Sequence, residues 1–354
     1  MPTSLMFATE LYALPILRPL AAAALARGHE VGWIVTGRVA AQLAPHERRL
    51  ATWAAIEASG AQAVFCAANW ISPRLPGTKV QVFHGFNAEK REPGRGHFAL
   101  RGFFDLYLTQ GPATTGPFEQ LAREHGYFAV RETGWPKLDP LFKPAAPSAD
   151  LNPHDGRPVV MFASTFSHRL SCAPFVLDTL RQLVARGDRY WLLTLHPKCP
   201  PELFEAYRSL AGPHARFEES GRLMDMQRAA DVLLCDTSSV LHEFAVQLKP
   251  VVTVRNRLPK PFMLDVQDPG GIDGAIATAL SRPEALMQAV RDHAGAIHPW
   301  RDGRSSERML DAVDAFHRGE LGPLKRKPLN LVRRYKAWRD IQELVGNVDS
   351  TPAG

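Results

Sequence analysis

The sequence predicts a two-domain α/β protein in which two Rossmann-like domains each carry a parallel β-sheet. Short apolar strands alternate with amphipathic helices through residues 1–142, and the same alternation restarts after residue 157. A stretch rich in Pro, Asp and Ala, residues 143–157, separates the two runs and is the predicted linker. A chain of 354 residues is long enough for two domains that each have a core.

The elements of the first domain, residues 1–142, follow from the spacing of its apolar residues. An amphipathic pattern predicts helices over 15–26 and 46–59, and the first of these ends at Arg27-Gly28. Short apolar runs predict strands over 5–8, 30–35, 63–66, 79–83 and 105–109. Strands separated by helices of this length pair in parallel, so we expect a doubly wound sheet.

The second domain, residues 158–320, repeats this organisation. The predicted strands are 158–163, 190–195, 230–234 and 251–254. The predicted helices are 174–186, 201–210, 240–248, 272–281 and 284–297. Ligands of such sheets bind at the carboxyl ends of the strands, so we expect a cleft between the domains to be lined by residues that follow strands.

The most informative of these strand ends is Asp236-Thr237-Ser238-Ser239, between a buried strand and a predicted helix. Thr and Ser are good helix N-cap residues, and the first amides of a helix have no partner within the helix. Such amides, together with the positive end of the helix dipole, suit a phosphate group. An ordinary serine cap on a crossover helix explains the same residues and stays open as the alternative.

Two histidines also follow predicted strands. His84 precedes Gly85 and can serve as a general base for a hydroxyl group, although a histidine held by a turn hydrogen bond would look the same. His196 precedes Pro197 and can donate to a phosphate oxygen or a leaving group, although a solvent-facing histidine would look the same.

Other polar residues stand at the same edge of the predicted sheets. Ser164 and Thr165 follow the strand 158–163. Lysines that can neutralise phosphate are Lys90, Lys137 and Lys198, although a single lysine is commonly a solvated surface charge. The sequence has no DxD motif or cluster of metal ligands at a strand end, so we expect amides and basic side chains, and no metal, to compensate the charge of a bound diphosphate.

Composition excludes several classes of protein. Apolar residues make up 45% and charged residues 22%, as in globular proteins, and no apolar run is long enough to span a bilayer. The four cysteines are scattered without a CxxC pair, which argues against a zinc site and a disulfide framework. The first residues lack the basic region of a secretory signal. We therefore expect a cytoplasmic protein.

The net charge of +6 comes from residues 325–339 of the predicted tail, residues 321–354. The segment from Lys325 to Arg339 holds seven basic residues and no acidic one. The rest of the chain holds the other 35 of the 42 basic residues and all 36 acidic ones. Apolar residues at helical spacing accompany them, including Tyr335 and Trp338. A basic amphipathic helix of this kind binds anionic membrane surfaces, whereas a helix packed back on the domains is the alternative. The near-neutral body argues against nucleic-acid binding.

Several short motifs, in order over residues 80–310, resemble the CDP-glycerol glycerophosphotransferase family, which makes teichoic-acid-type polymers. They are Phe83-His84-Gly85 with Lys90, Gly134-Trp135-Pro136-Lys137-Leu138-Asp139, Phe162-Ala163-Ser164-Thr165-Phe166, Leu195-His196-Pro197, Cys235-Asp236-Thr237-Ser238-Ser239-Val240, and Asp302-Gly303 with Ser305-Ser306-Glu307-Arg308.

The resemblance implies a GT-B fold and transfer of glycerol phosphate, or a similar alditol phosphate, from a CDP-activated donor to a hydroxyl of a glycan or lipid-linked acceptor. It implies no metal or other cofactor. The product would be a surface polymer of the cell envelope, such as a teichoic-acid-like chain or a capsule, made at the inner face of the cytoplasmic membrane.

The resemblance also implies roles for individual residues. The catalytic residues would be His84, as base, and His196. Residues that would bind the donor are Ser164, Thr165, Lys198, Asp236, Thr237, Ser238, Ser239, Glu243, Asp302 and Ser305. Residues that would contact phosphate or the acceptor are Lys90, Lys137 and Asp139.

Two other functions fit the same sequence features. A GT-B nucleotide-sugar glycosyltransferase or UDP-sugar 2-epimerase would share the two domains and the phosphate loop. A non-catalytic GT-B scaffold would keep the fold without the activity.

Overall fold

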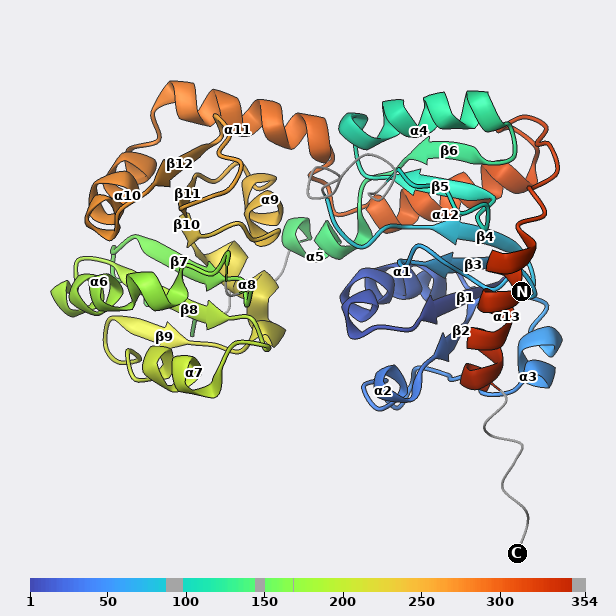
Figure 1. Cartoon of the computed structure of the whole chain (residues 1–354), viewed down its shortest axis with the longest axis horizontal. Helices are drawn as coiled ribbons and strands as arrows, with labels where there is room; N and C mark the ends of the chain where they lie inside the picture. The colour runs from blue at the N-terminus through green and yellow to red at the C-terminus, as the bar shows by residue number, and fades with distance from the viewer. Residues whose placement is uncertain (87–97, 144–149, 168, 346–354) are drawn as a thin grey trace, which may run out of the picture. The chain divides into compact units, whose positions relative to one another are not determined.

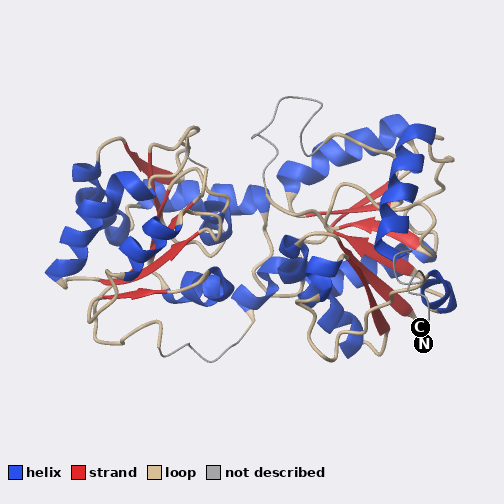
Figure 2. Ribbon diagram, turned by 60° about the horizontal axis from the view of Figure 1, so that its bottom comes forward, coloured by secondary structure: helices blue, strands red, loops and turns tan. Residues whose placement is uncertain are grey.

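The computed structural model describes residues 1–86, 98–143, 150–167 and 169–345 (Figure 1). The chain forms two compact units, Met1–Pro140 with Asp302–Gly354, and Leu141–Arg301. Each unit contains a six-stranded parallel sheet with helices on its faces (Figure 2). The predicted fold class is therefore confirmed.

In the first unit the strand order is β2-β1-β3-β4-β5-β6. The strands are β1 (Thr3–Ala8), β2 (Glu30–Val35), β3 (Ala63–Cys66), β4 (Thr78–Gln81), β5 (Leu106–Thr109) and β6 (Ala129–Glu132). The helices are α1 (Leu14–Ala26), α2 (Gly37–Ala40), α3 (Trp53–Ala58), α4 (Pro112–His125), α12 (Ser305–His317) and α13 (Leu331–Val345). The short helix α5 (Asp139–Phe142) carries the chain into the second unit.

In the second unit the strand order is β12-β11-β10-β7-β8-β9. The strands are β7 (Val159–Ser164), β8 (Tyr190–Leu195), β9 (Ala215–Phe217), β10 (Val232–Cys235), β11 (Val251–Val254) and β12 (Met263–Val266). The helices are α6 (Ala173–Arg186), α7 (Pro201–Arg208), α8 (Leu223–Ala229), α9 (Val240–Ala245), α10 (Ile272–Ser281) and α11 (Glu284–Ile297). The direction of winding reverses between β7 and β10, so the ligand-binding position of this sheet lies between these two strands.

Strand β7 is buried on both faces, as its unbroken apolar sequence requires. Alternate side chains of a strand point to opposite faces. Val160 and Phe162 pack with residues of α6, α7 and α10, whereas Val159 and Met161 pack with residues of α8, α9 and α11. The two apolar faces hold the end of β7 in place, and with it the polar residues that follow the strand.

Helix α12 belongs to the first unit, which differs from the expected second domain of residues 158–320. The reason is the buried carboxylate of Asp139. Its Oδ1 accepts a hydrogen bond from the Ser305 amide at 2.8 Å, and its Oδ2 accepts from the Ser306 amide at 2.8 Å and the Ser306 hydroxyl at 2.6 Å. This carboxylate therefore satisfies the free amides at the start of α12 and favours its positive end.

The predicted helix over 46–59 is wrong in its first half. Residues 48–50 run beside β2, where the Trp33 amide donates to the Arg48 carbonyl and the Leu50 amide donates to the Trp33 carbonyl. Helix α3 starts only after Thr52, whose hydroxyl accepts from the Ala55 amide at 3.2 Å. Pairing with a sheet edge therefore overrides local helix propensity in this segment.

The basic tail packs on the first unit through part of its length. Ala337 and Ile341 of α13 are buried in the unit's core, and the Lys327 ammonium lies 2.6 Å from the Asp105 carboxylate. Leu331 and Val332 at the start of α13 are 70% and 71% exposed. The side chain of Trp338 lies outside the described side chains. No helix within the described ranges is both long enough and apolar enough to cross a bilayer.

We predict that Asp139→Asn lowers the stability of the first unit, because it removes the charge that the buried Ser305 and Ser306 amides bind. Hydrogen bonds to a charged group contribute about 1.5–3 kcal/mol each, so we expect a loss of at least about 2 kcal/mol. Urea unfolding followed by circular dichroism measures it.

The matched control is Asp311→Asn on the same helix, where the carboxylate is 66% exposed and pairs with Arg27. Exposed ion pairs contribute about 0–1 kcal/mol, so this variant should stay close to the wild type. Equal losses in the two variants would contradict the structural role of Asp139.

Candidate active site

The predicted site residues of the second unit gather at the carboxyl ends of β7, β8 and β10. Asp236 follows β10 and is fully buried. Its carboxylate accepts from the Ser164 hydroxyl at 2.5 Å, from the Thr165 amide at 3.1 Å and from the Cys172 amide at 3.1 Å. These donors come from the end of β7 and the start of α6, so Asp236 joins the two sides of the position where the sheet changes its winding direction.

Burial raises the pKa of the Asp236 carboxyl above its usual value near 3.8, and the hydrogen bonds from Ser164, Cys172 and Thr165 oppose that rise. A buried carboxylate that accepts this many bonds fixes the backbone around it. Asp236 is therefore built to position the loop that follows it.

That loop, Thr237 to Ser239, presents three hydroxyl groups in front of α9. The Thr237 hydroxyl accepts from the Arg257 amide at 3.1 Å, and the Ser238 hydroxyl accepts from the Val240 amide at 3.4 Å. Within the described chain the Ser239 side chain makes no cap hydrogen bond, and α9 ends at Ala245, short of the predicted residue 248. The loop thus offers serine hydroxyls and the amides of a short helix rather than a strong helix dipole.

His196 follows β8 and has a defined tautomer. The Lys198 amide donates to its Nδ1 at 3.1 Å, so Nδ1 is the acceptor and the proton of the neutral ring is on Nε2. Burial and the nearby Lys198 charge lower the pKa of His196 below its usual value. The ring is therefore neutral at pH 7 and offers an Nε2–H donor. It packs against the ring of Phe166, with 4.4 Å between centroids, and the Lys198 ammonium lies 5.3 Å from the same ring.

Glu243 lies on α9 and is buried, with 4% of its surface exposed. The Gln227 side-chain amide donates to its Oε2 at 3.5 Å. The structure therefore places this predicted donor-binding residue beneath the loop and not at its surface.

In the first unit, His84 follows β4 and is exposed. Its Nδ1 lies 3.1 Å from the carbonyl oxygen of Ala67, which can only accept. Nδ1 therefore carries the proton, and Nε2 of the neutral ring is the basic nitrogen. This tautomer is the opposite of that of His196.

The turn that carries His84 is held from neighbouring strand ends. The Trp135 indole donates to the Phe83 carbonyl at 3.3 Å, and the Gln110 side chain donates to the Gly85 carbonyl at 3.2 Å. Phe83 has a φ of +59°, which is unfavourable for a residue with a bulky side chain. Its buried ring packs against Phe118, which helps to stabilise the turn in this conformation.

Four further predicted residues of the first unit already make contacts within the protein. Asp139 and Ser305 are buried and bonded to each other, as described above. Asp302 pairs with Arg308 at 2.7 Å and accepts from the Arg304 amide, which lowers the pKa of its carboxyl. The Lys137 ammonium lies 5.3 Å from the ring of Trp135. Lys90 is outside the described residues.

Sequence reasoning missed the loop that follows β11. Asn256 donates from its side chain to the Asp236 carbonyl at 3.4 Å, and the amide of Arg257 binds Thr237. Strand β11 was predicted correctly at 251–254, so the rule that site residues follow strands would have found this loop.

The sequence and fold were compared with known proteins. The model of the family described as CDP-glycerol:poly(glycerophosphate) glycerophosphotransferase matches residues 104–258. This range contains Trp135, His196, Asp236 and Arg257, whereas His84 precedes it. No curated protein sequence matches the chain.

Solved structures share the fold over most of the chain. The wall teichoic acid polymerase TagF has a TM-score of 0.64 at 14% identity, with 91% of each chain covered. A putative UDP-N-acetylglucosamine 2-epimerase from Listeria monocytogenes has a TM-score of 0.61 at 14% identity, with 93% of this chain and 100% of the other covered. MnaA from S. aureus, solved with UDP, has a TM-score of 0.60 at 16% identity, with 93% and 99% covered.

Identities this low establish the fold alone, and the polymerase TagF and the putative 2-epimerase share that fold. The family match supplies the distinction between them. The chain therefore has a GT-B fold and resembles the CDP-glycerol glycerophosphotransferase family over residues 104–258.

Proposed function

We propose that the enzyme transfers glycerol phosphate, or a similar alditol phosphate, from a CDP-activated donor to a hydroxyl of a glycan or lipid-linked acceptor during synthesis of a surface polymer. The family match supports the donor class. The acceptor is proposed from the chemistry of the reaction and from the tail.

The observation that carries this proposal is the pair of opposite histidine tautomers. Transfer to a hydroxyl needs a base that accepts the hydroxyl proton and a donor that binds charge on the departing phosphate. His84 presents a basic Nε2, because its Nδ1 donates to a carbonyl, and His196 presents an Nε2–H, because its Nδ1 accepts from an amide.

In the proposed reaction, Nε2 of His84 takes the proton of the acceptor hydroxyl. The oxygen then attacks the phosphorus that bears glycerol, a new P–O bond forms, and the P–O bond to CMP breaks. The electron pair of that bond leaves with CMP. The Nε2–H of His196 and the hydroxyls of Ser238 and Ser239 stabilise the charge on the CMP phosphate. Positioning and charge stabilisation supply most of the catalysis in such transfers.

The other predicted residues divide into ligand contacts and positioning residues in this proposal. Ligand contacts are Thr165, Lys198, Thr237, Lys137 and Lys90. Positioning residues, whose polar atoms already bind the protein, are Ser164, Asp236, Glu243, Asp139, Asp302 and Ser305. Arg257, which follows β11 and binds Thr237 through its amide, adds a cation beside the loop.

The start of the tail helix supports an acceptor at a membrane. Leu331, Val332 and Tyr335 are exposed; Arg333 lies between them in the sequence and Lys336 follows them. Exposed apolar side chains flanked by cations suit the surface of an anionic bilayer. We propose that the enzyme works at the inner face of the cytoplasmic membrane, with α13 packed on the first unit through Ala337 and Ile341.

The function is tested with a donor panel of CDP-glycerol, CDP-ribitol and UDP-N-acetylglucosamine in a thermal-shift assay, together with an assay of CMP release. We expect the CDP-alditols to raise the melting temperature, since a ligand at 100 times its Kd stabilises by about 2.7 kcal/mol. We expect His84→Ala to reduce CMP release by about 10²–10⁴-fold, the usual contribution of general base catalysis, with donor binding unchanged.

The control is His46→Ala, which changes another exposed histidine of the first unit and should keep full activity. Loss of donor binding in His84→Ala would remove His84 from the role of base. Stabilisation by the UDP-sugar alone would favour the epimerase or glycosyltransferase. Donor binding without CMP release, with any hydroxyl acceptor tried, would favour a scaffold.

We predict a pH-dependent stability effect of Asp236→Asn. Because the pKa of Asp236 is raised in the folded protein, its proton is held more tightly there than in the unfolded chain. The contribution of this carboxyl is most favourable below about pH 4 and declines as the pH rises through the raised pKa. The free energy of unfolding of the wild type minus that of the variant should therefore fall between about pH 4 and 7, as urea unfolding at a series of pH values would show. A rising difference would contradict the burial argument.

Membrane binding is tested by flotation with vesicles that contain anionic phospholipid. We expect Leu331→Ser with Val332→Ser to reduce the bound fraction about tenfold or more, because burial of each side chain contributes about 1.5–3 kcal/mol. The control is Leu25→Ser with Leu258→Ser, which removes two other exposed leucines. Equal partitioning of all three proteins would refute the membrane role of α13.

A further inference from the structure

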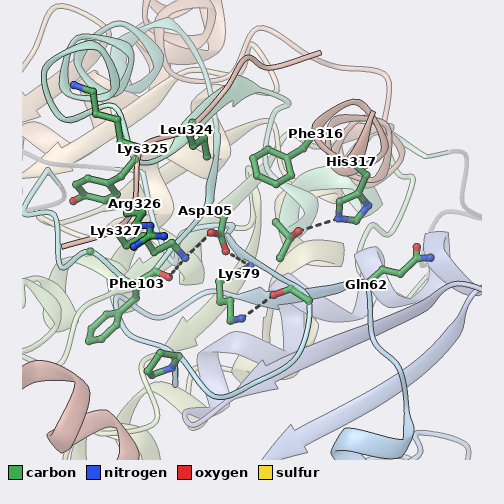
Figure 3. A pocket seen from close by; sticks show the side chains of 15 residues that line it. Gln62, Lys79, Phe103, Asp105, Phe316, His317, Leu324, Lys325, Arg326 and Lys327 are labelled. Atoms are coloured by element: carbon green, nitrogen blue, oxygen red, sulfur yellow. Dashed lines mark hydrogen bonds and ion pairs between the residues drawn. The ribbon is translucent and has the colours of Figure 1, made fainter. Parts of the chain in front are cut away.

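The first unit contains a pocket of about 810 Å³ that the proposed reaction does not use (Figure 3). Its lining includes Gln62, which precedes β3, Thr78 and Lys79 at the start of β4, and Asp105, which precedes β5. All strands of this sheet are parallel, so these residues lie at its amino edge. His84 follows β4 at the carboxyl edge. The pocket is therefore separate from the candidate active site.

Positive charge dominates the pocket. Four cationic side chains line it, Lys79, Lys325, Arg326 and Lys327, whereas Asp105 is the one carboxylate among the described lining residues. Lys327 neutralises Asp105, with 2.6 Å between Nζ and Oδ1, and Figure 3 shows the two side chains directed at each other. The remaining positive charge favours an anionic ligand.

The segment that supplies these cations is fixed in place. The Lys325 amide donates to the Gly126 carbonyl at 2.8 Å, and the Lys327 ammonium also donates to the Phe103 carbonyl at 2.8 Å. Gly126 has a φ of +75°, and a Cβ built on it would come within 2.9 Å of the Lys325 side chain. The lysine stem therefore packs directly over this glycine, and the cations are preorganised rather than carried on a loose tail.

The walls also offer apolar surface. Phe103 and Tyr127 are 5% and 8% exposed, and Phe316 and Leu324 also line the pocket. The volume is in the range of small-molecule sites and is larger than an inorganic phosphate requires. Arginine and lysine with apolar neighbours suit a phosphate that carries a short carbon skeleton.

We propose that this pocket is a second ligand site of the enzyme, which binds a phosphodiester of glycerol through Lys325 and Arg326. The choice of glycerol as the polyol rests on the proposed function, whereas the inference that the ligand is an anion rests on the pocket alone. A soluble glycerophosphodiester, such as a segment of the polymer, and the glycerol headgroup of a phospholipid share this chemistry.

The test uses the full chain and three proteins, the wild type, Lys325→Gln with Arg326→Gln, and the control Arg181→Gln with Arg208→Gln. The control removes the same charge from exposed arginines of α6 and α7. Isothermal titration with glycerophosphoglycerol measures the soluble source. Co-sedimentation with phosphatidylglycerol vesicles, compared with phosphatidylserine vesicles of equal charge, measures the lipid source.

We expect the pocket variant to lose at least tenfold in affinity for glycerophosphoglycerol or for phosphatidylglycerol vesicles, while the control binds as the wild type does. The arm that shows this loss identifies the source. The proposal would be overturned if the pocket variant lost affinity in neither experiment, or if the control variant lost as much affinity as the pocket variant. It would also be overturned if the wild type bound both vesicle types equally and showed no binding of glycerophosphoglycerol by titration.

Two further measurements keep the interpretation unambiguous. If the double variant has a lower melting temperature than the wild type, the single variant Arg326→Gln is used in its place. Thermal shift with CDP-glycerol on the pocket variant should still show donor binding. If none of the three proteins binds CDP-glycerol but the pocket variant still loses affinity for the glycerol phosphodiester, the proposed function is refuted and the anion site is supported.

Discussion

The hydrogen bonds between Asp139 and the start of α12 are the interaction on which the first unit depends. This unit is built from two parts of the chain, Met1–Pro140 and Asp302–Gly354, and Asp139 joins them with one buried carboxylate. Arg27 of the first part adds an ion pair to Asp311 on the same helix. Trp135, whose bond to Phe83 supports His84, lies four residues before Asp139 in the chain, and α12 also carries Phe316 and His317, which line the pocket.

Much of the fold could be predicted from local sequence because the central strands are apolar on both faces. Strands β2, β3, β8 and β11 match their predicted ranges. The strands β6, β9 and β12 were missed because they are short, lie at sheet edges and keep polar or half-buried residues. The sequence could not show that α12 belongs to the first unit, because this depends on the contact of Asp139 with residues more than 160 positions away.

The positions of the candidate site residues in the fold were predictable to the same extent. The rule that ligands meet the carboxyl ends of parallel strands placed His84, His196 and Asp236 at strand ends, where the structure has them. The tautomers of the two histidines were not predictable, because each is set by a backbone group that tertiary structure brings to Nδ1. The same holds for Asp236, whose partner Cys172 is 64 residues away.

The polymerase TagF and the putative 2-epimerase in the structural comparison share one fold, so the chemistry depends on which groups the strand ends present. In this protein the carboxylates of Asp236 and Asp139 accept hydrogen bonds from other parts of the chain and so have a structural role. Histidine nitrogens, serine hydroxyls and basic side chains remain at the surface of the site. In the proposed reaction, this division leaves neutral and cationic groups to bind the diphosphate of the donor.

The division of the chain also sets an order of events during synthesis. The second unit is one continuous segment, Leu141–Arg301, and its strands can pair as soon as that segment has left the ribosome. The first unit begins earlier in the chain but contains α12. It therefore cannot be completed until the whole inserted segment, and then α12, have been translated. At about 5–20 residues per second this delay lasts roughly eight to thirty seconds. Until α12 arrives, the apolar face that it covers is open to chaperones, and the second unit is the part that nascent chains complete first.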